Sequence, residues 1–407
     1  MATKIKLPDE LKASIGLSTQ EQLVEVVPRR WKLFIGIPKE NQFQEKRVGL
    51  TPASVGVLCS NGHRVVVESK AGEESKWTDA EFSEAGAEIA HTTEDVYKAD
   101  ILLKTAPPAQ EELKMMHPNQ IVISPLHLPT VEQSFLQQLI AKKITALAYE
   151  YIQDESNTFP IVSAMSEIAG SASILIAAEL LSHPSVGKGI LLGGIAGVPP
   201  ASVVILGAGT VGEFAARSAL SLGAEVKIFD NSIYKLKRLQ RNIATRVYTS
   251  VLALDVLVDA LVNADVAVGA IHSKSGRTPI IVTEEMVSQM KAGSVIVDVS
   301  IDQGGCFETS EITTHRKPVF KKFDVIHYCV PNIPSRVPRT ASQAISNVLT
   351  PMLLESSDMG GLEKLIATHA HLRNGVYIYR GMLTNAHLGE RFKMKFTDLN
   401  LIFASGM

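Results

Sequence analysis

The sequence predicts an α/β protein of two domains, each built around a mostly parallel sheet. Short apolar runs rich in Val and Ile alternate with helix-like segments over residues 32–149, and a second such series starts near residue 200. At 407 residues the chain is too long for one ordinary hydrophobic core. A long helix pattern follows each series, and the first of these is rich in small residues, which suits packing at a domain junction.

The elements follow from the apolar pattern in chain order. The first series predicts strands at 32–37, 64–68, 100–104, 120–124 and 144–149, with helices at 51–62 and 129–143. A long helix is predicted at 163–183. The second series predicts strands at 203–206, 225–229, 266–270 and 294–299. Another long helix is predicted at 340–356, and the tail is predicted to form a loop and a short strand.

This order suggests a discontinuous arrangement. Residues 161–338 would form one domain, inserted into a second domain made of residues 1–160 plus 339–407, with the two long helices joining them. The alternating pattern supports the two α/β series directly and the insertion only indirectly.

Composition excludes several classes of protein. The formal net charge is −2 and the basic residues are scattered, so neither nucleic acid nor an anionic membrane is an expected partner. The three cysteines form no CxxC pair and no histidines cluster at metal spacing, so we expect a reducing compartment and no metal site. The N-terminal stretch lacks the apolar core of a signal peptide. Residues 189–212 carry no charge, but Pro199-Pro200 predict a loop before a buried strand rather than a membrane helix. A cytoplasmic protein is expected.

The stretch "SVVILGAGTVGEFAARSALSLGAEVKIFD" (202–230) predicts a dinucleotide site of the Rossmann type. It contains GxGxxG at Gly207, Gly209 and Gly212, after an apolar strand and at the start of a helix. The first glycine permits a tight turn, the second lets the backbone approach a pyrophosphate, and the third lets the helix pack against the sheet. Free N–H groups at the helix N-terminus then face the phosphates.

Asp230 ends the next strand, where an acid accepts hydrogen bonds from ribose hydroxyls. Its charge would repel a 2′-phosphate, and no arginine follows at once, so NAD is favoured over NADP. The alternative is a glycine-rich turn that binds no nucleotide, with Asp230 as an ordinary loop acid.

Four polar residues at strand ends or in strand-following loops are candidates for chemistry. Asp302 follows the strand at 294–299 and could act on a water molecule, or it could simply be a turn residue before Gly304-Gly305. His127 follows another strand and could shuttle a proton, or be an ordinary core or capping residue. Arg47 could clamp a carboxylate or lie in a solvated loop. Lys104, in "ILLKTAPP", could bind substrate or be a strand-end residue that reaches for water.

Together, the individual phrases resemble the alanine dehydrogenase and pyridine nucleotide transhydrogenase α-subunit family. The matching stretches are "IGIPKENQFQEKRVGLTP", "ADILLKTAPP", "PLHLPT", "MSEIAG", "GILLGGIAGVPPASVVILGAGTVG", "VIVDVSIDQGGCFETS" and "HYCVPNIPSRVPRT". They follow the family's order from about residue 33 to 350. The last two look like alanine dehydrogenase rather than transhydrogenase.

The resemblance implies an NAD-dependent amino-acid dehydrogenase that converts L-alanine, NAD and water reversibly into pyruvate, ammonium and NADH. It also implies two Rossmann-like domains, with the NAD-binding domain inserted into a discontinuous substrate domain, and a homo-oligomer, commonly a hexamer. Arg47 would hold the substrate carboxylate, and His127 and Asp302 would handle protons. Ser166 would touch cofactor phosphate, and Asn332 would lie near the nicotinamide and substrate.

The chain departs from the family pattern near the expected substrate. The family's substrate lysine is the second of a Lys-x-Lys pair, which leaves Ala106 at that position and Lys104 as a possible substitute. His272-Ser273-Lys274 stands where the family is apolar. Two alternatives therefore stay open. One is a dehydrogenase for another amino or imino acid, or a transhydrogenase-like protein, and the other is a catalytically impaired NAD-binding relative.

Overall fold

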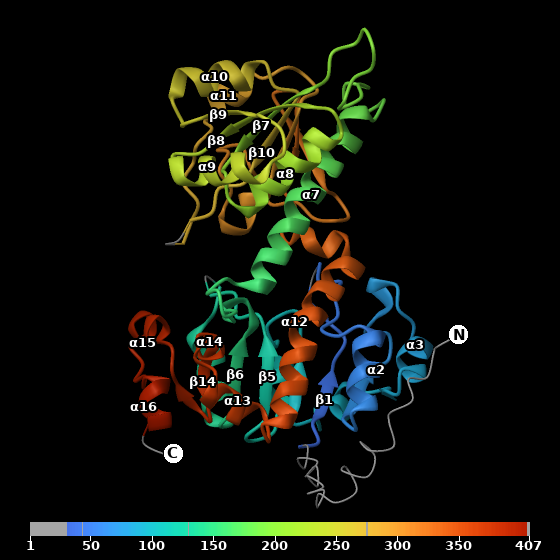
Figure 1. The fold of residues 1–407 in the computed structure, drawn as a ribbon, viewed down its shortest axis with the longest axis vertical. Coiled ribbons are helices and arrows are strands. Elements are labelled where there is room, and N and C mark those ends of the chain that lie inside the picture. The colour runs from blue at the N-terminus through green and yellow to red at the C-terminus, as the bar shows by residue number, and fades with distance from the viewer. Residues whose placement is uncertain (1–30, 43, 129, 274–275, 405–407) are drawn as a thin grey trace, which may run out of the picture.

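The chain folds into two lobes joined by a pair of long helices (Figure 1). The structure, a computed structural model, describes residues 31–404 apart from 43, 129 and 274–275. Lobe 1 is built on an eight-stranded sheet and lobe 2 on a seven-stranded sheet. The predicted features at 1–30 and at Lys274 lie outside the described residues.

The sheet of lobe 1 has the order β15-β14-β6-β5-β4-β1-β2-β3. Its strands are β1 (Phe34–Ile37), β2 (Arg64–Glu68), β3 (Glu88–Ala90), β4 (Ile101–Leu103), β5 (Ile121–Ser124), β6 (Thr145–Ala148), β14 (Val376–Tyr379) and β15 (Met382–Leu383). β1 to β6 are parallel, whereas β14 pairs antiparallel with β6. The C-terminal segment thus returns to the sheet of the N-terminal segment.

The sheet of lobe 2 has the order β12-β13-β11-β10-β7-β8-β9. Its strands are β7 (Ser202–Leu206), β8 (Glu225–Phe229), β9 (Tyr248–Ser250), β10 (Val266–Gly269), β11 (Val295–Asp298), β12 (Val319–Lys322) and β13 (Val325–Tyr328). All pairs are parallel except β12 with β13. In both sheets the direction of winding reverses beside the first strand, between β1 and β4 and between β7 and β10, where open α/β sheets bind ligands.

Helices cover both sheets. In lobe 1 they are α2 (Pro52–Ser60), α3 (Asp79–Glu84), α4 (Thr93–Val96), α5 (Gln110–Met115), α6 (Gln133–Ala141), α13 (Leu362–Thr368), α14 (Ala370–Arg373), α15 (Ala386–Phe392) and α16 (Leu399–Ala404). In lobe 2 they are α8 (Thr210–Ser221), α9 (Ile233–Asn242), α10 (Leu254–Val262) and α11 (Glu284–Ser288). Short 3₁₀ turns, η1 (Glu73–Ser75), η2 (Tyr149–Tyr151), η3 (Val299–Gln303) and η4 (Ile333–Arg336), follow strands or precede helices.

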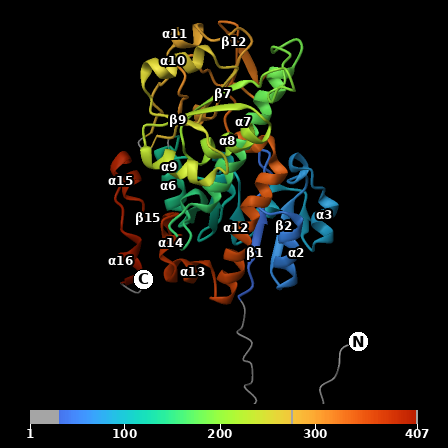
Figure 2. The same cartoon turned by 45° about the horizontal axis from the view of Figure 1, so that its top comes forward.

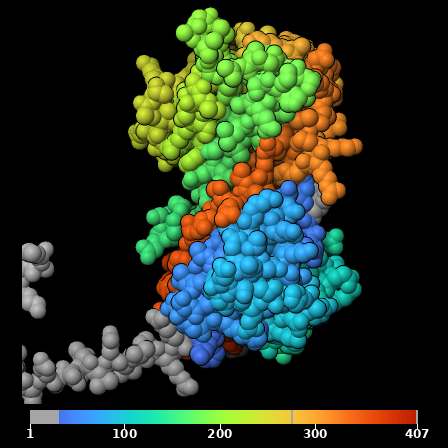
Figure 3. All heavy atoms as spheres, turned by 90° about the vertical axis from the view of Figure 1, so that its right-hand side faces the viewer, coloured from blue at the N-terminus to red at the C-terminus, as the bar shows by residue number. Residues whose placement is uncertain are grey.

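The two connecting helices are α7 (Pro160–Ser182) and α12 (Pro338–Asp358). They pack on each other and lie between the lobes in two views (Figures 1 and 2). The space-filling view shows the same strip of α7 and α12 between the lobes (Figure 3). The predicted boundaries 160/161 and 338/339 fall at the first turns of these helices, and the division into domains at those residues stays a prediction.

Helix α7 is long and apolar enough to cross a membrane if only length and composition are considered. In the structure it packs along α8 and α12, and its apolar side chains Ile174, Ile176 and Leu181 are buried inside the protein. The uncharged stretch at 189–212 forms a loop and then strand β7, as predicted.

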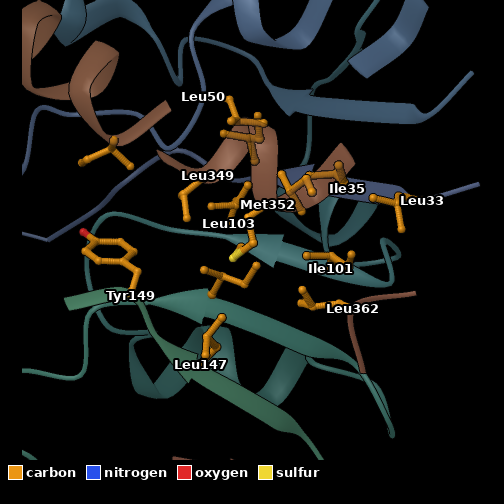
Figure 4. Packing of buried hydrophobic residues seen from close by; sticks show 14 of the residues in the cluster. Leu33, Ile35, Leu50, Ile101, Leu103, Leu147, Tyr149, Leu349, Met352 and Leu362 are labelled. Atoms are coloured by element: carbon orange, nitrogen blue, oxygen red, sulfur yellow. The ribbon is translucent and has the colours of Figure 1, made fainter. Parts of the chain in front are cut away.

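Lobe 1 has a core that continues into α12. Leu349 and Met352 of α12 point onto Leu103 of β4, close to Leu50 and Ile35 (Figure 4). Because these side chains are almost fully buried, each contributes about 1.5–3 kcal/mol relative to an exposed position. Helix α12 is therefore part of the core of lobe 1 as well as a connection between the lobes.

The predicted fold class is confirmed, because two mainly parallel sheets are joined by two long helices. Every strand predicted from the two series is present within a residue or two at each end. The pattern did not predict β12 and β13, nor β3 and β9, which are three-residue strands at the sheet edges with partly exposed side chains. Edge strands this short carry too little apolar alternation to be recognised.

Candidate active site

Arg47 lies in the loop between β1 and α2, at the winding reversal of lobe 1. It is 7 % exposed, so the interpretation of a solvated loop residue is wrong. Its Nε and Nη2 donate to the two carboxylate oxygens of Glu45, at 2.7 and 2.5 Å. Burial alone would lower the pKa of Arg47, but the charge and hydrogen bonds of Glu45 raise it, so the guanidinium stays charged.

The edge of this guanidinium that does not contact Glu45 faces a thioether sulfur. Nη1 has the sulfur of Met165, on α7, at 3.4 Å. A thioether is a weak acceptor, so the two hydrogens of Nη1 are the donors most easily given to a ligand. Arg47 can therefore bind a carboxylate while Glu45 holds its other edge.

Asn332 links the two lobes through the ion pair of Arg47 and Glu45. Its Nδ2 donates to Glu45 at 3.1 Å, and its backbone N–H donates to Oδ1 of Asp302 at 2.9 Å. Asn332 has φ = 55°, a left-handed conformation that asparagine tolerates better than most residues. A continuous chain of hydrogen bonds thus runs Arg47–Glu45–Asn332–Asp302.

Asp302 lies in η3, just after β11, where its side chain is exposed to solvent although many protein atoms lie around it. Burial raises its pKa, although the Asn332 N–H and the charge of Arg47 oppose this shift. A carboxyl with a raised pKa can exchange protons nearer neutral pH than an ordinary aspartate.

His127 lies in the loop after β5, with φ = 50°. Burial and then the charge of Arg47 lower its pKa, so the imidazole is neutral at neutral pH and can accept a proton. His127 also lines a cavity of about 280 Å³ with Gln42, Pro107, Leu126 and Phe135. This cavity lies after β4 and β5, at the carboxyl edge of the sheet.

Glu150 holds the backbone at His127 and was not singled out from the sequence. Its Oε1 accepts the N–H groups of Leu126 and His127, at 2.7 and 3.2 Å. Its Oε2 is buried without a hydrogen-bond partner, and burial raises the pKa of this carboxyl more than the two N–H groups lower it. An acid directly after an apolar strand, the signal that identified Asp230, would have found it.

Lys104 is fully buried and paired with two acids. Its Nζ lies 2.7 Å from Glu40 and 2.9 Å from Glu112. Burial would lower its pKa, but these two carboxylates raise it, so the lysine is charged. The interpretation of a strand-end residue that reaches for water is wrong, and the occupied Nζ favours a structural role over substrate binding.

Glu40 also fixes the turn that follows Lys104. Glu40 Oε1 accepts the N–H groups of Thr105, at 2.6 Å, and Ala106, at 3.3 Å. The carbonyl of Thr105 then accepts from Tyr149 Oη at 3.3 Å and from Arg47 Nη2 at 3.4 Å. Lys104 is thus connected to Arg47 through the backbone of this turn. Ala106 is 2 % exposed and offers no cation.

The three glycines of GxGxxG occupy three different environments. Gly207 has φ = 110°, and a Cβ there would lie 2.3 Å from the carbonyl of Ala270. A Cβ at Gly212 would lie 1.8 Å from the carbonyl of Gly207. A Cβ at Gly209 would meet no protein atom within 4 Å, so the space beside the start of α8 is open.

Asp230 lies at the end of β8, beside this loop. Its two oxygens accept the N–H groups of Ala208 and Ser232, at 2.8 and 2.7 Å, and Lys235 Nζ lies at 3.8 Å. Each carboxylate oxygen has a second lone pair, so a ligand hydroxyl can still be bound. Asp230 also fixes the position of the glycine-rich loop.

Ser166 lies on α7, one residue after Met165 and one helical turn before Gly170. A Cβ at Gly170 would lie 2.3 Å from the carbonyl of Val211, so α7 touches the first turn of α8 at this point. Residues four apart share a helix face, so Ser166 lies on the side of α7 that faces α8. His272 follows β10 by three residues and keeps part of its side chain in solvent; partial desolvation and then the charge of Lys235 lower its pKa. In the described part of the chain no three His, Cys, Asp or Glu residues form a group that could hold a metal ion.

Comparison with known families agrees with this architecture. The family model for the N-terminal domain of alanine dehydrogenase/PNT (pyridine nucleotide transhydrogenase) matches residues 36–169, and the model for the C-terminal domain matches residues 173–386. The chain belongs to the alanine dehydrogenase/PNT family. The C-terminal match continues past α12 and through β14 and β15, which the structure places in the sheet of lobe 1.

Individual relatives align with this chain over most of its length. The chain is 38 % identical to an alanine dehydrogenase of Mycolicibacterium smegmatis over 367 residues, 90 % of this chain and 98 % of that protein. It is 39 % identical to alanine dehydrogenase 2 of Staphylococcus aureus, with the same shares covered. The resemblance to this family and the expectation of an enzyme of its type are thereby confirmed at the level of the family.

Solved structures show the same fold. An L-alanine dehydrogenase superposes with a TM-score of 0.83 at 37 % identity, covering 88 % of this chain and 99 % of that one. A transhydrogenase from Sinorhizobium meliloti gives a TM-score of 0.74 at 24 % identity, which supports the fold alone. The predicted pair of Rossmann-like lobes is therefore shared with an alanine dehydrogenase of known structure.

Proposed function

We propose that this chain catalyses the reversible NAD-dependent oxidative deamination of L-alanine to pyruvate and ammonium. The observation that carries the proposal is the chain of contacts Arg47–Glu45–Asn332–Asp302, which joins a carboxylate-binding cation in lobe 1 to a proton-exchanging acid in lobe 2. Relatives named alanine dehydrogenase, at 38 and 39 % identity, support it.

The described residues fit a bound dinucleotide. Gly209 leaves open space at the N-terminus of α8, where a pyrophosphate would meet free N–H groups. Asp230 offers a carboxylate for ribose hydroxyls, and its charge disfavours a 2′-phosphate. NAD would supply the acceptor for the hydride that leaves the substrate Cα.

The residues of the proposed site have separate roles in the reaction. Arg47 orients the substrate carboxylate through Nη1 while Glu45 keeps the guanidinium in place. Neutral His127 accepts a proton from the substrate amino group. Ionised Asp302 removes a proton from the water that attacks the substrate imine, and pyruvate forms as ammonia leaves. Asn332 holds Asp302 at the correct distance from Arg47.

A second candidate is deamination of a larger amino acid. The cavity of about 280 Å³ beside His127 favours it, since Pro107, Leu126 and Phe135 supply an apolar wall next to a catalytic group. Ala106 is buried and brings no cation to the substrate carboxylate, which Arg47 would bind. We also propose a homo-oligomer, on the basis of the family resemblance, and a cytoplasmic location, on the basis of the cysteine pattern and the N-terminal composition.

The test is NADH formation by the purified full-length chain with a panel of L-amino acids at alkaline pH. We expect kcat/KM to be highest with alanine and far lower when NADP replaces NAD. A higher kcat/KM with leucine or valine would support the second candidate. NADH binding without turnover of any amino acid would contradict both candidates and indicate an impaired relative.

A pair of glycine substitutions tests the cofactor site. Gly209→Ala is expected to leave the melting temperature unchanged, because its Cβ meets no protein atom, but to raise the Kd of NADH at least about tenfold by occupying the pyrophosphate space. Gly212→Ala is the matched control, and its Cβ would clash with the Gly207 carbonyl and destabilise the fold by about 1–3 kcal/mol. Calorimetric titration and thermal melts measure both. Unchanged NADH binding in Gly209→Ala would place the cofactor elsewhere.

A further inference from the structure

The loop that carries Arg47 is fastened by serines that lie far away in the sequence. The described residues between β1 and α2 form no strand or helix, so their backbone N–H groups need other partners. Lys46, Val48 and Thr51 donate to serine hydroxyls 289 to 295 residues later, at 2.8, 2.9 and 2.9 Å. The acceptors are Ser335, Ser342 and Ser346, each with no exposed surface.

Each of these serine hydroxyls makes a second contact, either with a backbone carbonyl of the loop or with another hydroxyl. Ser335 Oγ donates to the carbonyl of Gln44 at 2.7 Å, and Ser346 Oγ lies 3.4 Å from the carbonyl of Gly49. Ser342 Oγ lies 3.3 Å from Ser75 Oγ, whose hydroxyl donates to the carbonyl of Lys46. The loop is therefore held on both sides of Arg47.

The three serines lie on one continuous segment. Ser335 is in η4, which begins directly after Asn332, and Ser342 and Ser346 are one turn apart on the same face of α12. Asn332 itself contacts both Glu45 and Asp302. The segment that contacts the acid of lobe 2 is thus the segment that holds the arginine of lobe 1.

Ordinary helix packing does not account for this arrangement. A buried serine inside a helix usually bonds to a carbonyl of the preceding turn. Ser356, in the same helix and also fully buried, does so, since its Oγ donates to the carbonyl of Leu353 at 2.7 Å. Ser342 and Ser346 instead use their hydroxyls to accept from the Arg47 loop.

We propose that Ser335, Ser342 and Ser346 are positioning residues that set the place of Arg47 relative to Asn332 and Asp302, and thereby the affinity for the substrate carboxylate. The assignment of a carboxylate to Arg47 rests on the proposed function. The serines touch no substrate and act through the backbone on each side of Arg47. A misplacement of about 1 Å in such a clamp is enough to cost up to about 100-fold.

The test compares Ser342→Ala, Ser346→Ala and the double variant with Ser356→Ala in the full-length protein. We expect each single loop-contacting variant to raise the Kd of pyruvate, titrated with NADH present and ammonium absent, by about 3- to 10-fold, and the double variant by more. The Kd of NADH should stay within about twofold, since the GxGxxG loop is untouched. Ser356→Ala should leave both dissociation constants unchanged, even if it lowers the melting temperature as much as Ser342→Ala and Ser346→Ala do.

Hydrogen exchange gives a readout that needs no substrate. Amides in residues 44–51 should exchange faster in Ser342→Ala and Ser346→Ala but not in Ser356→Ala. Unchanged exchange in this segment would overturn the inference whether or not the protein binds pyruvate, and so would an equal rise in the Kd of pyruvate in Ser356→Ala. Wild-type protein that binds NADH but no pyruvate would instead contradict the proposed function, and faster exchange would then still show that the serines hold the loop.

Discussion

Replacing Asp302 by asparagine is expected to lower kcat for alanine deamination by about 10²- to 10⁴-fold, the usual contribution of a positioned acid–base group. Asparagine keeps the shape of the side chain, and its Oδ1 can still accept the backbone N–H of Asn332, which wild type holds at 2.9 Å. The contact between the lobes should therefore persist, while the group that exchanges a proton is lost. Steady-state NADH formation measures the effect, and the Kd of NADH, expected to be unchanged, is the control.

The pH dependence gives a second readout for the same residue. Burial raises the pKa of Asp302, so its carboxyl becomes protonated at a higher pH than an ordinary aspartate as the solution is acidified. The ionised form is the base, so kcat/KM for deamination should fall as pH decreases through this pKa. The acid limb should change in Asp302→Asn. A kcat within about threefold of wild type at every pH would assign the base elsewhere.

Replacing Lys104 by methionine is expected to destabilise the fold by about 3–5 kcal/mol, as when one partner of a buried ion pair is removed. Methionine has a similar length, so little volume changes, but Glu40 and Glu112 would face each other without the cation that lies at 2.7 and 2.9 Å. Urea unfolding followed by circular dichroism measures the loss for lobe 1. If Lys104 were a substrate ligand instead, stability would change little and the Kd of pyruvate would rise.

The matched control removes the acids as well. Glu40→Gln and Glu112→Gln, combined with Lys104→Met, leave no charge in this cluster, while glutamine oxygens can still accept the N–H groups of Thr105 and Ala109. The triple variant should regain most of the lost stability, because neutral replacement of a buried ion cluster is often tolerated. A triple variant as unstable as Lys104→Met would show that packing, not charge, is the cause.

The local sequence was sufficient to predict features that depend on residues close together in the chain. Gly207, Gly209 and Gly212 have their distinct environments because a strand, a turn and a helix follow one another within a few residues. The apolar runs predicted the strands on which Arg47, His127, Asp302 and Asp230 depend, since residues after parallel strands gather at one edge of a sheet. Those candidates could be named without knowing their neighbours.

The partners of these residues could not be named in the same way. Glu40 reaches Lys104 over 64 residues, and Asn332 reaches Glu45 over 287. The loop after β1 has the same charge pattern whether it is solvated or buried. Its charged residues are Lys39, Glu40, Glu45, Lys46 and Arg47. Burial decides the outcome, and burial depends on how α12 packs against the first sheet.

The sequence by itself thus determined two lobes with mainly parallel sheets, a glycine-rich loop between a strand and a helix, and the chain positions of the candidate site residues, because strand alternation and glycine conformation are properties of short segments. Only the tertiary structure decided that Lys104 is enclosed by two acids, that Glu45 holds Arg47, and that serines of η4 and α12 fasten the Arg47 loop. These contacts join segments far apart in the chain, and their strength comes from removing charges and N–H groups from water, which happens only once both lobes are packed.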